Sequence, residues 1–258
     1  MIRNKVALVT AGSGGIGKAI VYKLLEGNYN VAVTGRSYTK LEDTFNNVPS
    51  NRILFVETDL SSLPSMATAL EQTIEKFGQL NLLVNNAGGA TLYQPCEFGT
   101  EESFNNSFDL NVKTTYFMSQ YAIPYLIETK GCIINLSSVL ASRPAQGLGA
   151  YCASKAAVEM LTKTTALELA PKGVRVLCVA PTATETEFHV NAGMSQEEAT
   201  AYYKACASTH PLGRAGLPND SAEVVVFLAE HASFMTGSVV HVDGGRLLTS
   251  ASAFTSKN

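Results

Sequence analysis

Short apolar runs alternate along the chain with longer segments in which apolar residues recur every three or four positions. The short runs are rich in Val, Ile and Leu and apolar on both faces, as is typical of buried parallel strands. The predicted strands are 5–9, 30–34, 52–57, 80–85, 132–136, 174–180 and 238–242, and the predicted helices are 16–26, about 38–47, 64–77, about 101–128, 150–170 and 219–230. This alternation predicts an α/β protein with a doubly wound sheet of about seven parallel strands and helices on both faces.

One segment, about 186–216, breaks the alternation. It is long, has no obvious strand, and contains SQEEATAYYKACAS, which predicts a short helix. A long insertion after the carboxyl end of a strand is a common place for a substrate lid. Because no repeat or linker divides the rest of the chain, we expect residues 1–258 to form a single domain.

Composition narrows the range of partners. Charged residues make up 16% of the chain, which indicates a large buried surface, including subunit contacts. The net charge is -3 and no cluster of Lys and Arg stands out, so we expect no nucleic-acid partner. The five cysteines are scattered, as in reduced cytosolic proteins. The first residues, MIRNKVALVT, lead directly into a predicted strand and leave no room for a signal peptide, and no apolar run reaches the length of a membrane span. We therefore expect a cytoplasmic location and no membrane partner.

A glycine-rich turn, VTAGSGGIGKAI, follows the first predicted strand. Such turns hold phosphate groups, because glycine lets backbone N–H groups approach an anion at a helix N-terminus. Gly12, Gly17 and Lys18 fit the start of a nucleoside-triphosphate loop, but Ala19 stands where that loop needs Ser or Thr to hold Mg²⁺. Gly12, Gly15 and Gly17 favour a dinucleotide-binding turn instead.

The end of the second predicted strand indicates which dinucleotide is bound. Enzymes that use NAD carry an acidic residue about 20 positions after the first glycine, where it binds the adenosine ribose. Gly35 stands near that position and Arg36 follows it. An arginine can bind the 2′-phosphate of NADP, so we expect NADP(H), with Ser37 as a helper. The alternative interpretation of Arg36 is a solvated charge at the end of a strand.

Three residues are candidates for acid–base chemistry. Tyr151 and Lys155 are four residues apart in a predicted helix and therefore share a face. An ammonium near a phenol favours the phenolate, so we expect Lys155 to lower the Tyr151 pKa from about 10 and to assist proton transfer. Ser138 follows the strand 132–136, at the edge where ligands bind in an open sheet, and its hydroxyl can bind a substrate carbonyl.

Taken together, these motifs resemble the short-chain dehydrogenase/reductase family over nearly the whole chain. In chain order the matching motifs are TAGSGGIG (10–17), TDL with Asp59, NNAG (85–88), LNV with Asn111, Ser138 with YCASK (151–155), VAPTATET with Pro181, and HVDGG (241–245). This set of ordered motifs at the family's spacing is a specific signal.

The resemblance implies a Rossmann fold and an oxidoreductase that transfers a hydride between NADP(H) and a carbonyl or secondary-alcohol substrate, without a metal. It implies that Tyr151 exchanges the proton, Lys155 holds the nicotinamide ribose, Ser138 orients the substrate oxygen, and Asn111 positions a water that links Lys155 to solvent. The cofactor-binding residues that it implies are Ala11, Gly12, Ser13, Gly15, Ile16, Gly17, Arg36, Ser37, Asp59, Leu60, Asn86, Ala87, Gly88, Tyr151, Lys155, Pro181, Thr182, Thr184 and Thr186. It also implies a homotetramer or homodimer, in agreement with the apolar residues found around much of the helix 150–170.

The sequence departs from the family's motifs at a few positions. Ala11 replaces the first motif glycine, and we expect the turn to survive with a negative φ at this residue. Thr182 replaces the glycine after Pro181, and Gly14 stands where NADP-preferring members often carry a basic residue.

Two other functions stay open at this stage: an NAD-dependent alcohol dehydrogenase, and a catalytically idle dinucleotide-binding sensor. The segments expected to bind substrate suggest a largely apolar pocket for a ketone, a steroid-like or acyl carbonyl, or a quinone. Its candidate residues are Leu92, Tyr93, Leu140, Leu148, Phe188, Met194 and Tyr202.

Overall fold

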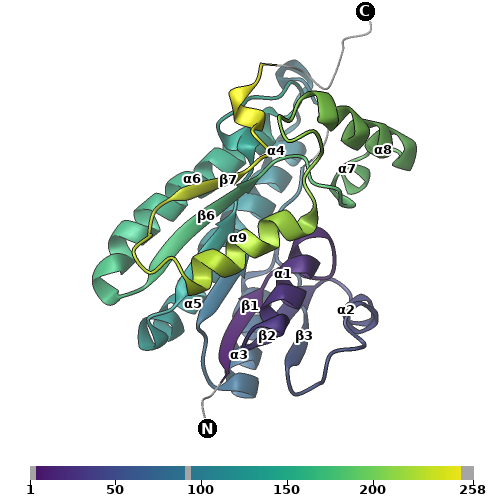
Figure 1. Ribbon diagram of the computed structural model, residues 1–258. Helices are drawn as coiled ribbons and strands as arrows, with labels where there is room; N and C mark the ends of the chain where they lie inside the picture. The colour runs from purple at the N-terminus through teal and green to yellow at the C-terminus, as the bar shows by residue number, and fades with distance from the viewer. Residues whose placement is uncertain (1–3, 91–93, 251–258) are drawn as a thin grey trace, which may run out of the picture.

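A computed structural model of the chain describes residues 4–90 and 94–250. Seven parallel strands form one sheet in the order β3-β2-β1-β4-β5-β6-β7 (Figure 1). The strands are β1 (Lys5–Val9), β2 (Tyr29–Gly35), β3 (Ile53–Glu57), β4 (Leu82–Asn85), β5 (Cys132–Leu136), β6 (Arg175–Pro181) and β7 (Val239–Val242). The predicted doubly wound Rossmann sheet is confirmed, and the strand bounds lie within two residues of those expected from the sequence.

Helices cover both faces of the sheet because its central strands bury side chains on both sides. Along β1, Ala7 and Val9 face one apolar core, whereas Val6 and Leu8 face the other. The first core lies under α1 (Gly15–Glu26), α2 (Tyr38–Thr44) and α9 (Pro218–Glu230), and the second under α3 (Leu63–Phe77), α5 (Thr114–Thr129) and α6 (Gly149–Leu169) (Figure 1).

The region expected to form one helix over 101–128 is divided. Helix α4 (Glu101–Phe108) runs into a π-helical segment, η2 (Asp109–Lys113), and the helix then continues as α5. Hydrophobic periodicity does not reveal such a change, because a single widened turn shifts the pattern only slightly. Asn111 lies in the middle of η2, and π-helical turns inside helices are frequent at functional sites.

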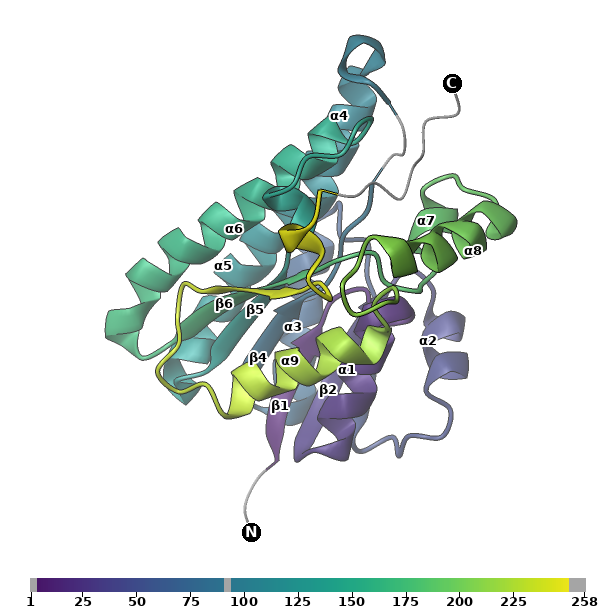
Figure 2. The ribbon, with the colours of Figure 1, turned by 45° about the horizontal axis from the view of Figure 1, so that its top comes forward.

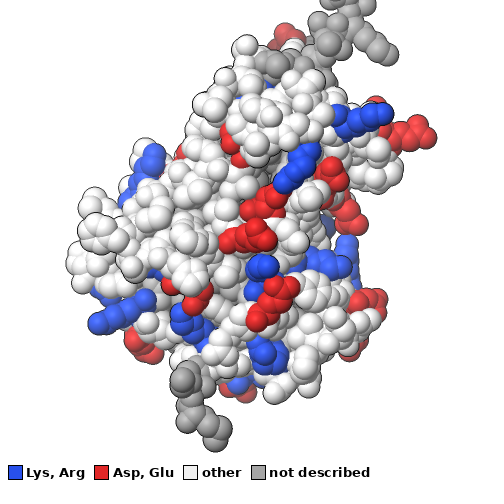
Figure 3. All heavy atoms as spheres, viewed as in Figure 1, with Lys and Arg blue, Asp and Glu red and all other residues white. Residues whose placement is uncertain are grey.

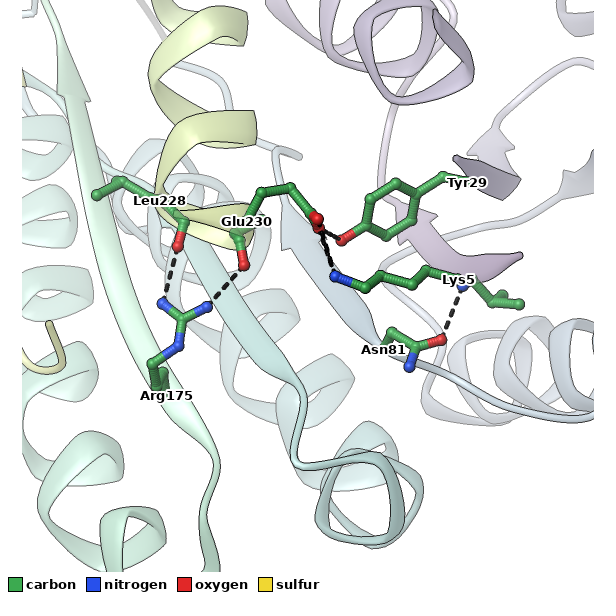
Figure 4. Close-up of polar contacts among 8 residues, drawn as sticks. Lys5, Tyr29, Asn81, Arg175, Leu228 and Glu230 are labelled. Carbon is green, nitrogen blue, oxygen red and sulfur yellow. Dashed lines mark hydrogen bonds and ion pairs between the residues drawn. The ribbon is translucent and has the colours of Figure 1, made fainter. Parts of the chain in front are cut away.

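The amino-terminal ends of the strands are tied together by polar contacts at the end of α9 (Figure 4). The Lys5 ammonium lies 2.8 Å from the Glu230 carboxylate, which also accepts a hydrogen bond from the Tyr29 hydroxyl. Arg175, at the start of β6, donates to the carbonyl of Leu228 at 2.8 Å. These contacts join α9 to β1, β2 and β6, so they hold the end of the sheet that lies away from the carboxyl ends of its strands.

The carboxyl-terminal edge of the sheet opens between β1 and β4. Strand β1 pairs with β2 on one side and β4 on the other, so the loops after β1 and β4 diverge and leave a crevice at this point. Beyond the same edge stand α7 (Phe188–Asn191) and α8 (Gln196–Ala205), which belong to the expected lid (Figure 2). Within the described residues, we find no helix with the length and apolarity needed to span a bilayer.

Candidate active site

A cavity of about 1150 Å³ occupies this crevice and extends under the lid. Loops from both halves of the sheet line it, together with residues of α6, α7 and α8. The predicted cofactor residues that line it are Ala11, Ser13, Gly15, Ile16, Gly17, Arg36, Asp59, Leu60, Asn86, Ala87, Gly88, Tyr151, Lys155, Pro181, Thr182, Thr184 and Thr186. Gly12 and Ser37 are the two predicted residues that do not line it.

The turn between β1 and α1 is formed, but not in the way expected for Ala11. Its φ is +51°, so the expectation of a negative φ is wrong. The Ala11 N–H donates to the Thr34 hydroxyl at 3.1 Å, and its carbonyl accepts from the Asn86 amide at 3.1 Å. These contacts from β2 and from the loop after β4 hold the peptide groups of Ala11 in the left-handed conformation that glycine adopts more readily.

The glycines of this turn serve different purposes. A Cβ at Gly12 would collide with the side chain of Val33, so Gly12 faces the sheet rather than the cavity. A Cβ at Gly17 would lie 2.5 Å from the Asn86 side-chain nitrogen, so glycine there lets α1 approach the loop after β4. A Cβ at Gly14 would meet no atom within 4 Å. The N-terminus of α1 thus faces open space, and this cradle fits the pyrophosphate of a dinucleotide.

The carboxyl end of β2 brings basic side chains to the cavity. Arg36 is exposed and, within residues 4–90 and 94–250, makes no hydrogen bond or ion pair. Lys40 also lines the cavity, and its ammonium lies 3.5 Å from the carboxylate of Glu187 in the lid. Ser37 caps α2 by accepting a hydrogen bond from the Lys40 N–H, which accounts for its place outside the cavity wall. Lys40 was not predicted from the sequence, because Arg36 lies before α2 and no helical spacing links the two residues.

An acidic residue after β3 lies on the same side of the cavity. The carboxylate of Asp59 accepts hydrogen bonds from the N–H of Ser61 at 2.9 Å and from its hydroxyl at 2.7 Å. These hydrogen bonds hold the Asp59 pKa below its usual value, so the side chain remains an acceptor at neutral pH. This position suits an amino group of an adenine ring.

Ser138, Tyr151 and Lys155 come together in a different part of the cavity from Arg36 and Asp59, and all three are buried. The Lys155 ammonium lies 5.7 Å from the centre of the Tyr151 ring and donates to the carbonyl of Leu136 at 2.9 Å. Ser138 caps a short helical turn, and its oxygen accepts from the Leu140 N–H at 3.2 Å. The triad of predicted catalytic residues is therefore held by β5, by the turn after it and by α6.

Burial controls the ionisation of this triad. It raises the Tyr151 pKa to about 12, although a hydrogen bond with Ser138 opposes the rise. It also lowers the Lys155 pKa to about 8. The expectation that Lys155 lowers the Tyr151 pKa is therefore wrong for the protein alone. Loss of solvent outweighs the ammonium, which is directed to the Leu136 carbonyl.

Asn111, the fourth predicted catalytic residue, lies near the triad but does not line the cavity. It is fully buried, its side-chain oxygen accepts from the Gly89 N–H, and its nitrogen donates to the Gly89 carbonyl and the Ser154 hydroxyl, each at 2.9 Å. A Cβ at Gly88 would lie 2.9 Å from the Lys155 ammonium and 3.0 Å from the Asn111 oxygen. The loop after β4 is thus fixed between η2 and α6, and glycine at 88 leaves room for Lys155.

The loop after β6 carries the family's altered Pro-Gly position. Thr182 lies 2.7 Å from Nε2 of His210, and Nδ1 of His210 lies 3.0 Å from the Cys206 carbonyl. Because a carbonyl only accepts, Nδ1 carries the proton and Nε2 accepts from the Thr182 hydroxyl. His210 therefore anchors Thr182 at the cavity wall. It follows Thr182 by 28 positions, and no motif links the two in the sequence.

The substrate side of the cavity is less apolar than expected. Of the candidates named from the sequence, Leu140, Leu148, Phe188 and Tyr202 line it, Met194 does not, and Leu92 and Tyr93 lie outside the described residues. Arg143 and Arg246 also line the cavity, and sequence reasoning had not selected them. No group of His, Cys, Asp and Glu suited to a metal ion occurs in the part of the chain that the structure describes.

Comparisons with known proteins agree with this geometry. A family model described as Enoyl-(Acyl carrier protein) reductase matches residues 10–246. The L-fucose dehydrogenase of Bos taurus is 32% identical over 242 residues, which cover 94% of this chain and 89% of that protein.

Two solved structures are similar over 95% of this chain. The 3-ketoacyl-(acyl-carrier-protein) reductase from Brucella melitensis, complexed with NADH, is 31% identical with a TM-score of 0.86, and 99% of that chain is covered. ElxO with NADP bound is 30% identical with a TM-score of 0.87, and 100% of that chain is covered.

Proposed function

Because the chain belongs to the short-chain dehydrogenase/reductase family, we propose that it is an NADP(H)-dependent oxidoreductase that transfers a hydride between the cofactor and a carbonyl or secondary-alcohol substrate. One observation carries this proposal. A single cavity joins the glycine cradle and Arg36 to the buried triad of Ser138, Tyr151 and Lys155. Such a cavity offers a dinucleotide site and an acid–base site in contact with each other.

The chain's own residues supply binding, orientation and proton transfer. With a pKa of about 12, Tyr151 holds its proton at neutral pH and donates it to the carbonyl oxygen of a substrate during reduction. The Ser138 hydroxyl hydrogen-bonds the same oxygen and orients it. Lys155 lies between Tyr151 and the loop after β4, where it binds ribose hydroxyls. NADPH, when bound, supplies the hydride.

The NADP preference rests on charge at the end of β2. Within the described residues the Arg36 side chain makes no hydrogen bond or ion pair, so its guanidinium is available for a 2′-phosphate, and Lys40 adds a second positive charge on the same wall. Gly35 provides no carboxylate to repel the phosphate. The solved relatives include one with NADH and one with NADP, so the argument depends on these residues of the chain itself.

The experiment is a measurement of kcat/KM with NADPH and NADH over a panel of ketones and aldehydes. We expect wild-type protein to prefer NADPH, and Arg36→Ala to lower NADPH efficiency by about tenfold with little change for NADH. The matched control is Lys18→Ala, which removes an exposed cation from the first turns of α1 but not from the cavity wall.

Three results would contradict parts of the proposal. A preference of the wild type for NADH, or an equal loss with both cofactors in Arg36→Ala, would refute the NADP assignment. Tight NADPH binding without turnover of any carbonyl in the panel would instead favour the catalytically idle sensor.

A further inference from the structure

Two arginines from distant parts of the chain meet on the substrate side of the cavity. Arg143 belongs to the segment between β5 and α6, and Arg246 begins the short helical turn η6 (Arg246–Leu248) after β7. Both donate from Nη1 to one acceptor, the carbonyl oxygen of Thr249, at 2.8 Å and 3.5 Å respectively. The two guanidinium groups are therefore close neighbours, although they carry the same charge.

The positive charge of Arg246 is not neutralised inside the described residues. Its guanidinium donates hydrogen bonds to the carbonyl and the hydroxyl of Thr249, and no carboxylate lies within ion-pair distance in residues 4–90 and 94–250. Asp243 is near in the chain, but it accepts from the N–H groups of Gly245 at 3.0 Å and Leu247 at 2.8 Å. Burial and the charge of Arg143 lower the Arg246 pKa, yet an arginine stays protonated in proteins.

The carboxylates that line the cavity are engaged elsewhere. Asp59 accepts two hydrogen bonds from Ser61, and Glu187 pairs with Lys40. Among residues 4–90 and 94–250, the positive charge of Arg246 on the substrate side is therefore not compensated by a carboxylate. In a partly buried site such an uncompensated charge is unfavourable until an anion offsets it.

Aromatic rings connect the catalytic phenol with the arginines. The centre of the Phe188 ring lies 5.8 Å from that of Tyr151 and 5.4 Å from that of His189. The next ring, Tyr202, lies 4.7 Å from His189, and it is close enough to Arg246 to influence its pKa. One wall of the cavity is thus aromatic from the site of proton transfer to the arginine pair.

We propose that the preferred substrate is an elongated carbonyl compound, or the corresponding alcohol, that carries a carboxylate or sulfonate at the end away from the reacting carbon. Its anionic group binds Arg143 and Arg246, and its apolar or aromatic body packs on Phe188 and Tyr202. This inference rests on the proposed oxidoreductase function and names the class of its substrate. Planar guanidinium groups suit such oxyanions, because they donate two hydrogen bonds to each.

The test compares acids with their neutral esters. The probes are 4-formylbenzoate and 4′-formylbiphenyl-4-carboxylate, each beside its methyl ester, with NADPH as reductant. For at least one length, we expect wild-type kcat/KM to be about tenfold or more higher for the acid than for the ester. Arg246→Gln should lower the value for that acid by about tenfold, mainly through KM, and leave the ester within about twofold.

Two further variants separate charge from structure. Arg246→Lys keeps the charge and should retain part of the preference for the acid. Arg214→Gln is the matched control, because Arg214 pairs with Asp220 outside the cavity wall and its loss should not change the ratio of acid to ester.

A binding measurement gives a second readout that does not depend on turnover. Calorimetric titration of biphenyl-4,4′-dicarboxylate into protein saturated with NADP⁺ should show weaker binding to Arg246→Gln than to wild type, by about tenfold. Three results would overturn the inference. They are equal binding of the dicarboxylate to both proteins, equal activity of the wild type toward esters and acids, and an equal loss of activity toward acid and ester in Arg246→Gln. If neutral carbonyls react but acids show no advantage, the inference fails and the oxidoreductase function stands.

Discussion

Tyr151 shows how burial fixes the direction in which a residue works best. Since its pKa is raised to about 12, the phenol is a proton donor over the whole neutral range. Reduction of a carbonyl needs this protonated form, whereas oxidation of an alcohol needs the phenolate. In the proposed mechanism, this residue therefore favours reduction at neutral pH and oxidation at alkaline pH.

We expect Tyr151→Phe to lower kcat for carbonyl reduction by about 10² to 10⁴-fold, because only the proton donor is removed. The dissociation constant of NADPH should stay within a few-fold of wild type in a fluorescence titration. Tyr22→Phe is the control, since this tyrosine donates to the Thr44 carbonyl away from the triad. Activity of Tyr151→Phe within a few-fold of wild type would remove Tyr151 from the mechanism.

The buried ammonium of Lys155 makes the free energy of unfolding depend on pH. Its pKa is about 8 in the folded protein and has the ordinary lysine value of 10.5 in the unfolded chain. Between these two pH values, the unfolded chain therefore binds more protons than the folded protein. The contribution of Lys155 to the free energy of unfolding should therefore rise with pH from about 8 to 10.5, whereas the thiols of Cys132 and Cys178 and the Tyr151 phenol, whose pKa values burial raises, act in the opposite direction from about pH 9 upward. Chemical denaturation of wild type and Lys155→Met at several pH values checks this. Identical slopes for the two proteins would show that the buried ammonium is not the cause.

The turn between β1 and α1 holds a side chain in a backbone conformation that favours glycine. Ala11 has a φ of +51°, and this costs an L-residue about 1–2 kcal/mol. We expect Ala11→Gly to raise the free energy of unfolding by up to about 1 kcal/mol, because glycine also loses more chain entropy on folding. Denaturant unfolding measures this. The control is Ala19→Gly inside α1, which should lower stability by about 0.5–1 kcal/mol.

Elements with strong local patterns could be predicted from the sequence. The strands are continuous apolar runs, and α1, α3, α6 and α9 begin and end within one residue of the predicted bounds. Ser138, Tyr151 and Lys155 could be selected because Ser138 follows the end of β5, and because Tyr151 and Lys155 lie four residues apart on one face of α6. The π-helical turn at Asn111 could not, because it leaves the apolar period almost unchanged.

Residues that meet only through the fold were missed. Arg246 reaches Arg143 through the pairing of β7 with β6, and His210 reaches Thr182 through the lid segment. None of these contacts has a local signature in the chain. The positive φ of Ala11 was also missed, because two neighbouring segments impose it through Thr34 and Asn86.

Across the whole molecule, apolar side chains stay exposed on faces away from the cavity. The exposed fraction is 50% for Tyr116 on α5, and 57% for Met160 and 79% for Leu167 on α6. Phe234 and Leu248, before and after β7, are also exposed, and uncharged surface extends over this part of the molecule in Figure 3. Exposed apolar side chains of this kind are typical of surfaces that are covered by another subunit.

We propose a homotetramer and expect its mass in light scattering at micromolar concentration. Leu167→Glu should reduce the mass, because it places a charge in the apolar face of α6. Lys76→Glu on α3 is the control for a change of surface charge and should leave the assembly intact. A monomeric mass for the wild type would contradict the proposal.

The ion pair between Lys40 and Glu187 has a consequence for how firmly the nucleotide is enclosed. It joins α2 to the residue that precedes α7, yet its two partners are exposed and such pairs contribute only about 0–1 kcal/mol. In the proposed complex with NADPH, the 2′-phosphate competes with Glu187 for the same ammonium, whereas NADH leaves the pair in place. Backbone amides of α7 should therefore exchange hydrogen for deuterium faster with NADPH bound than with NADH bound, and added salt, which screens the pair, should reduce this difference.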